Sequence, residues 1–358
     1  MANNWNRTAT AQATIKDVAK EAGVSTATVS RVLTGNANVS SELHQRVQSS
    51  MEKLGYQPRR LARSLRLKVA STFGLVVSDI NDPFFNSVAR HVESLAYEIS
   101  YSTILCNSDE DPQKENYYLE ILLSERVAGV ILAPCSETDY PLVETMINAG
   151  IAVVCIDRAI RSPEVDTILV DNIQGTTQAI SHLIQLGHQR IAAVLPSGMH
   201  TVGLERRKAY EEVLHSENIP ISPEWFVELN GSSDENIHSV KRLLSLPISI
   251  RPTGLFIAST HMLIDTLKAI NDTGLKVPED IALVVFGDSP FSALTSPPLS
   301  VVQQPVKQIA NLAVMCLMDR TREPGIPRKT FRLPTKFVVR ESCGLKTKMK
   351  KNGGSIIC

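Results

Sequence analysis

Small polar side chains and one guanidinium crowd a short stretch near the amino terminus, at residues 26–31. Hydroxyl groups can donate and accept hydrogen bonds at base edges, methyl groups can contact the thymine methyl, and an arginine can bind guanine through two hydrogen bonds. A helix with such small side chains can enter a major groove about 12 Å wide. The stretch is therefore predicted to read DNA bases, with Thr26, Ala27, Thr28, Ser30 and Arg31 as the candidates.

Two short helices joined by a tight turn would position these side chains. Thr14 can cap the first helix together with Asp17 in a reciprocal capping arrangement. Gly23 would end that helix with a positive φ, and Ser25 would cap a second helix over 26–33. The apolar residues at helical spacing would face inwards: Val18, Ala19, Ala22, Val24, Val29 and either Val32 or Leu33. Taken alone, the pattern also fits a helical hairpin without function.

A third helix is predicted from Ser41 to the glycine at position 55. Its apolar residues are spaced by four, four and three positions, as one face of a helix requires: Leu43, Val47, Met51 and Leu54. Three such helices would make one all-α module over 14–58.

Charge is divided unevenly along the chain. Residues 1–68 hold 11 Lys and Arg against 4 Asp and Glu, a net +7, and residues 69–358 hold 26 against 33, a net −7. The basic residues include those of the segment RRLARSLRLK at 59–68, directly after the three helices. Neutralisation of DNA phosphates explains a basic head, whereas an acidic body should stay away from DNA.

Short apolar runs alternate with helical patterns throughout the body. Strands are predicted at 73–77, 102–106, 127–132, 152–156, 191–195, 254–258 and 281–286, and helices at 84–100 and 112–124. That rhythm indicates parallel βαβ units in two halves, with a cleft between two lobes. In open parallel sheets ligands lie at the carboxyl ends of the strands, so the residues after each run are the candidates for the cleft.

Composition excludes several other classes. The segment 1–13 has no apolar run typical of a secretory signal and is predicted to be a disordered arm, no stretch approaches a membrane span, and a cytoplasmic protein is expected. The six cysteines form no CxxC pair and no zinc spacing, so neither a metal nor a cofactor is expected. GxGxxG, GxxxxGK[ST] and GxSxG are all absent, and His188 is better explained by packing than by catalysis, so the chain is not predicted to be an enzyme.

The segments TIKDVAKEAGVSTATVSRVLTG, VSSELHQRVQSSMEKLGYQP and RRLARSLR resemble the lactose-repressor (LacI/GalR) family of bacterial transcription factors. The resemblance implies a helix-turn-helix head over 14–58 and a hinge helix over 59–68. It also implies that Thr26, Ala27 and Arg31 read bases, and that Leu65 enters the minor groove as an apolar wedge. Ordinary core packing is the alternative for Leu65. The predicted DNA-binding residues are Thr14, Ser25, Thr26, Ala27, Thr28, Ser30, Arg31, Tyr56, Arg59, Arg60, Ala62 and Leu65.

The remainder resembles the sugar-sensing core of the same family, which implies a two-lobed periplasmic-binding-protein type I fold over 69–344. Lobe one is expected at about 69–171 and 304–330, and lobe two at about 172–303 and 331–344, before a flexible tail at 345–358. The overall fold class is α/β. The tail has no heptads of the kind that build a tetramer, so a homodimer on a palindromic operator is expected.

Seven effector-binding residues are predicted from strand ends and from this resemblance: Asp82, Phe84, Asp157, Arg158, Arg206, Ser259 and Asp288. In the family an aromatic residue of NPFF packs on the sugar, the counterpart of Asp157 accepts hydrogen bonds from hydroxyls, and the counterpart of Arg206 binds the ligand. Core packing is the alternative for the phenylalanines, and an inter-helix salt bridge for Arg206.

The chain also departs from the family pattern. It has Ser259-Thr260 where the family usually has Asn-Asp, Gly287-Asp288 where two aspartates are usual, and Asp82 in place of the asparagine of NPFF. Two arginines near the cleft suggest a sugar acid or a phosphorylated sugar as effector. A global catabolite regulator using a phosphorylated carrier protein is an alternative, and a sugar transport receptor is another. Whether the effector induces or co-represses stays open.

Overall fold

The computed structural model describes residues 13–33, 39–56, 71–197, 200–229 and 232–344, and it divides into two compact units at Ala70 and Ser71. The predicted hinge segment 59–68, the tail 345–358 and all but residue 13 of the predicted arm therefore lie outside the described residues. Each unit is described by itself.

The amino-terminal unit has three helices: α1 (Ile15–Glu21), α2 (Thr26–Leu33) and α3 (Ser41–Leu54). The carboxylate of Asp17 accepts hydrogen bonds from the backbone N–H of Thr14 at 2.8 Å and from its hydroxyl at 2.6 Å. Gly23 has φ +62°, and the hydroxyl of Ser25 accepts from the backbone N–H of Thr28 at 3.1 Å. The helices close over a small core that includes Val18, Ala19, Ala22, Val29, Val32 and Val47. The predicted capping and turn are thus confirmed.

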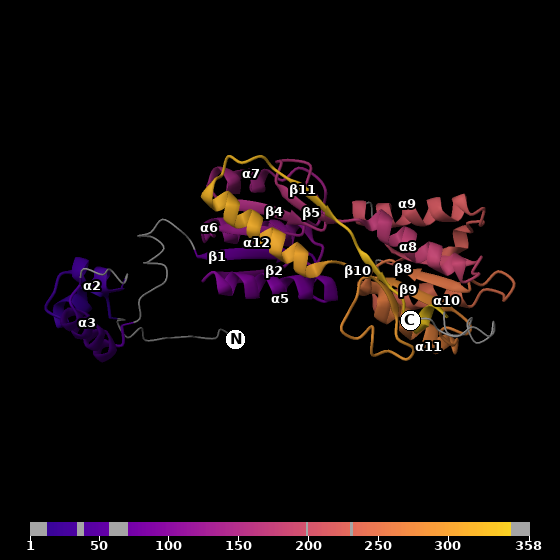
Figure 1. Cartoon of the computed structure of the whole chain (residues 1–358), viewed down its shortest axis with the longest axis horizontal. Helices are drawn as coiled ribbons and strands as arrows, with labels where there is room; N and C mark the ends of the chain where they lie inside the picture. Colours follow the sequence, from indigo (N-terminus) through magenta and orange to yellow (C-terminus); the bar gives the residue numbers. More distant parts are fainter. Residues whose placement is uncertain (1–12, 34–38, 57–70, 198–199, 230–231, 345–358) are drawn as a thin grey trace, which may run out of the picture. The chain divides into compact units, whose positions relative to one another are not determined.

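Lobe one of the second unit is built on a parallel six-stranded sheet in the order β11-β5-β4-β3-β1-β2 (Figure 1). Its strands are β1 (Thr72–Val77), β2 (Ser102–Asn107), β3 (Gly129–Leu132), β4 (Ala152–Ile156), β5 (Asp166–Val170) and β11 (Thr330–Leu333). Its helices are α5 (Pro83–Glu98), α6 (Pro112–Ser124), α7 (Pro141–Asn148) and α12 (Val306–Arg322).

Lobe two repeats the design with the strand order β12-β10-β9-β8-β6-β7, in which only β12 pairs antiparallel. Its strands are β6 (Ile191–Pro196), β7 (Phe226–Leu229), β8 (Gly254–Ile257), β9 (Ala282–Phe286), β10 (Ser300–Gln303) and β12 (Lys336–Val338). Its α-helices are α8 (Asn172–Gln185), α9 (Thr201–Ser216), α10 (Ser233–Leu244) and α11 (Leu263–Thr273), with short 3₁₀ helices at Pro223–Trp225, Thr260–Met262 and Glu341–Cys343.

The chain passes three times between the lobes: before α8, after β10 and after β11. The last passage corrects one expected boundary. The sequence predicts residues 331–333 in lobe two, but they belong to β11, which pairs with β5 of lobe one from Thr330 to Leu333. Backbone pairing therefore holds the chain in lobe one a few residues longer than its sequence suggested. Among the described helices, none is long and apolar enough to cross a membrane.

Candidate effector cleft and DNA-reading helix

Helix α2 buries Val29 and Val32 and leaves its opposite side open to solvent. Thr26, Ala27 and Arg31 are exposed, and Thr28 and Ser30 are half-buried, so the predicted base-reading residues share a helix whose apolar side is already used. Thr14 and Ser25 cap helices, and Tyr56 packs against the head core. Arg59, Arg60, Ala62 and Leu65 lie outside the described residues.

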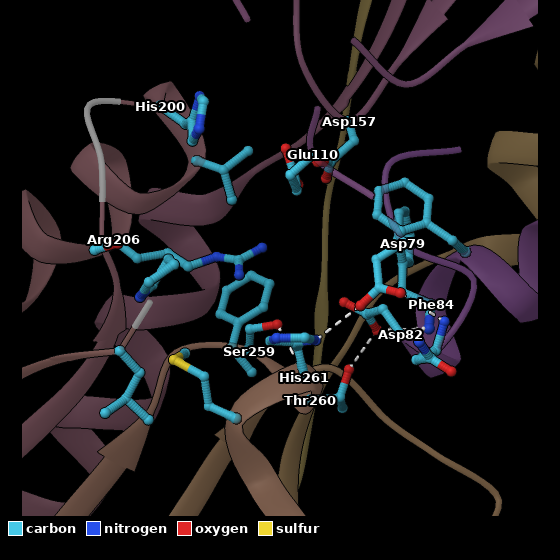
Figure 2. A pocket seen from close by; sticks show the side chains of 18 of the residues that line it. Asp79, Asp82, Phe84, Glu110, Asp157, His200, Arg206, Ser259, Thr260 and His261 are labelled. Carbon is cyan, nitrogen blue, oxygen red and sulfur yellow. Dashed lines mark hydrogen bonds and ion pairs between the residues drawn. The ribbon is translucent and has the colours of Figure 1, made fainter. Parts of the chain in front are cut away.

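A cavity of about 480 Å³ separates the two lobes at the carboxyl ends of their parallel strands (Figure 2). Six of the seven predicted effector residues line it: Asp82, Phe84, Asp157, Arg158, Arg206 and Ser259. They come from the segments after β1, β4 and β8 and from α5 and α9. Asp288 does not line this cavity, because its carboxylate forms an ion pair with Arg340 at 3.2 Å beside a neighbouring cavity.

Arg206 is the more deeply buried of the two arginines that line the cleft, with 5 % of its surface exposed. Its Nε donates to Oδ1 of Asn172 at 3.0 Å and its Nη1 donates to the carbonyl of Ala258, while its guanidinium carbon lies 3.7 Å from the centre of the Phe286 ring. Burial lowers the pKa of Arg206 to about 10, opposed by the charge of Asp157. The side chain is therefore a positioned cation at neutral pH rather than an inter-helix salt bridge.

Asp157 has an unusual backbone for a residue other than glycine. Its φ is +67°, and the N–H of Arg158 donates to the carbonyl of Ile156 at 2.7 Å, which closes a tight three-residue turn. Conformations of this kind cost roughly 1–3 kcal/mol and are concentrated at functional sites. Burial raises the pKa of Asp157, although Arg158 and Arg206 both favour the charged form.

Arg158 is held by a carboxylate that the sequence did not single out. Its two terminal nitrogens donate to Glu110 at 2.8 and 2.7 Å, and Nη1 also donates to the carbonyl of Pro134. Burial disfavours the charge on Arg158, but Glu110 and Asp157 outweigh it and hold its pKa above the usual range. Its buried Nε makes no hydrogen bond to any described residue and lies 3.7 Å from Oδ2 of Asp157.

The two lobes contact each other directly across the cleft. Asp82 Oδ1 accepts from the hydroxyl of Thr260 at 2.8 Å, and Asp79 Oδ2 lies 2.9 Å from Nδ1 of His261 (Figure 2). On another side, the carboxylate of Glu137 accepts from the backbone N–H of Thr201 at 3.1 Å. Lobe-to-lobe hydrogen bonds of this kind favour the closed arrangement of the core.

Carboxylates outnumber guanidinium groups in the lining. Asp79, Asp82, Asp109, Glu110 and Asp157 face two arginines, and the two histidines of the lining are His200 and His261. Asp79 and Glu110 could have been found from the sequence, because both follow strands that the sequence predicted. No group of side chains suited to a metal ion occurs within the described ranges.

A helix-turn-helix unit followed by two parallel-sheet lobes around a polar cleft defines a DNA-binding regulator with a ligand-binding core. Residues 14–59 match the model of bacterial regulatory proteins of the lacI family, and residues 180–343 match that of a periplasmic binding protein-like domain. The chain is 34% identical over 331 residues to the HTH-type transcriptional repressor PurR of Aliivibrio fischeri (strain MJ11), covering 92% of this chain and 98% of that protein.

Two solved structures have the same architecture. A complex of the transcriptional regulator CelR with cellobiose is 28% identical, with a TM-score of 0.67, over 92% of this chain and 99% of that one. The lac repressor dimer bound to operator is 24% identical, with a TM-score of 0.78 and the same coverage, and it supports the fold. The chain belongs to the LacI family of bacterial regulatory proteins. It is a DNA-binding transcriptional repressor and not an enzyme.

Proposed function

We propose that a small neutral sugar binds in the inter-lobe cleft and controls how tightly the repressor holds a palindromic operator. The single observation that carries this proposal is that a buried cation and a largely buried carboxylate line the same cavity. Arg206 and Asp157 supply fixed donors and acceptors on opposite lobes, as recognition of hydroxyl groups requires. Phe84 offers an apolar surface on which a sugar ring can pack.

The charges favour a neutral effector over the sugar acid or phosphorylated sugar suggested by the two arginines. Arg158 is neutralised by its paired hydrogen bonds with Glu110, so it is not free to bind an anionic group. An anion would also face the carboxylates of Asp79 and Asp82. The CelR complex provides a precedent for a neutral sugar in a related core.

The site can act on DNA through lobe closure. Because Asp82–Thr260 and Asp79–His261 join the lobes at the cleft, a ligand that contacts both lobes would stabilise the same closed arrangement. A difference in affinity between open and closed forms is what an effector needs to shift their populations. The hinge segment at 59–68 would transmit the change, with Leu65 as the wedge in the minor groove.

A dimer is part of the proposal, because one recognition helix reads few bases and two-fold symmetry matches a palindrome. On the core, the outer strand β2 exposes Ile104 and Leu105 beside Ile80 and an adjoining groove of about 300 Å³. A second copy of the chain is the occupant that we propose for this surface. Such a regulator would act in the cytoplasm, where the operator DNA is.

The test is fluorescence anisotropy with an operator selected from random palindromic DNA, repeated with neutral, amino, acid and phosphorylated sugars. Release of DNA by one neutral sugar would identify an inducer, and tighter binding would identify a co-repressor. Preference for an anionic sugar would contradict the proposed neutral effector. If no sugar changes the affinity for the operator, but a phosphorylated carrier protein does, the result would support the catabolite regulator instead.

A further inference from the structure

A second cavity of about 490 Å³ adjoins the effector cleft and shares Phe84 and Gln304 with it. Its walls come from three parts of the core: α5 of lobe one, the loop after β9 of lobe two, and the passage from β10 into α12. Polar and charged side chains of the lining include Ser87, His91, Asp288, Gln304 and Lys307.

The first turn of α12 opens on this cavity without a side-chain cap. Pro305 stands at the N-cap and has no hydroxyl or carboxylate to offer, and the first turn contains no acidic residue. The backbone N–H groups of Lys307 and Gln308 donate to no described residue. These donors and the positive end of a 17-residue helix favour a bound anion.

Gln304 supplies an independent indication of a ligand. Its side chain lines both cavities and only 9 % of the residue is exposed, yet its amide forms no hydrogen bond within the described part of the chain. A polar ligand in the cavity could pair with this amide, because the amide can donate as well as accept.

We propose that this second cavity binds a phosphate group at the amino terminus of α12. Lys307 provides a positive charge beside the free N–H groups, and Gln304 and Ser87 provide further hydrogen-bonding groups. The Nδ1 of His91 lies 2.8 Å from the carbonyl of Ser87, so Nε2 is the ring nitrogen left for another partner. The carboxylate of the lining, Asp288, is compensated by Arg340 at 3.2 Å and by the amide of Gln303 at 3.1 Å.

The position of the site gives it a role separate from effector recognition. A phosphate there would contact α5 of lobe one and the loop after β9 of lobe two, and would thus favour closed lobes. Since Phe84 and Gln304 line both cavities, phosphate and effector should each raise the affinity for the other by the same factor.

The test is calorimetric titration of the full chain, without effector, using inorganic phosphate and glycerol 3-phosphate as probes. Gln308→Glu places a carboxylate in the first turn of α12, where it would repel a phosphate dianion. The matched control is Gln113→Glu, which makes the same charge change in the first turn of α6, already capped by Asp111. Both glutamines are exposed, so both variants should fold.

We expect saturable phosphate binding to the unmodified chain and to Gln113→Glu, at least tenfold weaker binding to Gln308→Glu, and an intermediate loss in Lys307→Gln. Tighter binding of inorganic phosphate would identify the free ion as the ligand, and tighter binding of glycerol 3-phosphate would identify a phosphate monoester. The absence of saturable binding, or equal binding by Gln308→Glu and the unmodified chain, would overturn the proposal. Equal binding by Gln308→Glu and the unmodified chain would indicate that phosphate binds instead to the basic residues of the amino-terminal head.

Discussion

The hydroxyl of Thr260 in lobe two donates a hydrogen bond to the carboxylate of Asp82 in lobe one, at 2.8 Å. Gly287 explains why a threonine is accommodated at this position. A Cβ on Gly287 would lie 2.9 Å from Cγ2 of Thr260, and its φ is +103°, so a side chain there would be crowded as well as strained. The two departures from the family pattern, at 260 and 287, therefore depend on each other.

Replacing Thr260 with valine should loosen the closed core. The change keeps the shape of the side chain and removes one hydrogen bond to a charged group, which typically contributes about 1.5–3 kcal/mol. We expect effector affinity to fall by roughly tenfold and the effector-free core to become more open. Calorimetry and small-angle scattering would measure the two effects, and unchanged values in both would contradict the role of this contact.

Replacing Arg206 with methionine should abolish effector control and leave operator binding intact. Loss of the cation removes one of the two guanidinium charges that favour ionised Asp157, the other being Arg158. It also removes donors for the ligand, and a hydrogen bond to a charged group typically contributes about 1.5–3 kcal/mol. Effector affinity should fall at least a hundredfold. Arg207→Met is the matched control, because Arg207 lies on the same helix but pairs with Glu211 of that helix and with Glu228 of β7. Equal losses of effector affinity in both variants would contradict the proposal that Arg206 binds the effector.

Replacing Asp157 with asparagine should make the effector-free protein more stable at neutral pH while weakening effector binding. Burial raises the pKa of Asp157 in the folded protein, so the proton-bound form is favoured there relative to the unfolded chain. Its contribution to stability is therefore complete below the unfolded pKa and is lost as pH rises through the folded pKa. Asparagine tolerates positive φ and cannot ionise.

The melting temperature of the asparagine variant should thus exceed that of the unmodified protein at pH 7, and the difference should shrink towards pH 4. Thermal unfolding across that range, without effector, would measure it. A variant that is less stable at pH 7 would show that ionised Asp157 stabilises the fold instead.

Replacing Arg31 with alanine should weaken specific operator binding by about 1–3 kcal/mol and relax base preference at one position of each half-site. Lys53→Ala provides a control, since Lys53 is exposed on α3 and pairs with Glu21. Anisotropy titrations with single-base operator variants would separate lost base reading from lost phosphate attraction. A uniform loss across all operators would show that Arg31 binds the backbone.

Replacing Arg320 with methionine should strongly destabilise lobe one. Arg320 and Asp166 are each 3 % exposed at the side chain and are joined at 2.6 and 3.0 Å, and Arg320 also donates to the carbonyls of Pro324, Ile326 and Pro327. Breaking a buried pair on one side costs about 3–5 kcal/mol. Chemical denaturation would measure the loss, and a change below 1 kcal/mol would contradict it.

Sequence patterns predicted the turns, caps and helix ends that are formed by residues close together in the chain. The turn at Gly23, the cap at Ser25 and the end of α3 at Gly55 each depend on residues within a few positions of one another. Most of the buried parallel strands were also predictable, because they appear in the sequence as continuous apolar runs. Four of the strands that the sequence does not predict, β7, β10, β11 and β12, have only three or four residues, so their apolar runs are short. The fifth, β5, lies inside its sheet but begins with the polar residues Asp166 and Thr167.

Long-range pairing explains what sequence patterns could not predict in the cleft. Arg158 was expected to attract an anionic ligand, but its partner Glu110 lies 48 positions away, and Asp288 is drawn from the cleft by Arg340, 52 positions further on. Thr260 and Asp82 meet across 178 positions. The strand ends correctly indicated which residues lie near the cleft. Which of their charges can act on a ligand depends on these distant partners.

The triple passage of the chain between the lobes restricts how such a regulator can be recombined. Neither lobe is a continuous segment, since lobe one takes α12 and β11 from beyond residue 303 and lobe two takes β12 from beyond β11. Exchange of one lobe between relatives would therefore need several simultaneous junctions. The head, contained in residues 1–70, needs only one. Specificity for a new operator can therefore be gained by exchange of the whole head. Specificity for a new effector is more simply gained by substitutions within the cleft.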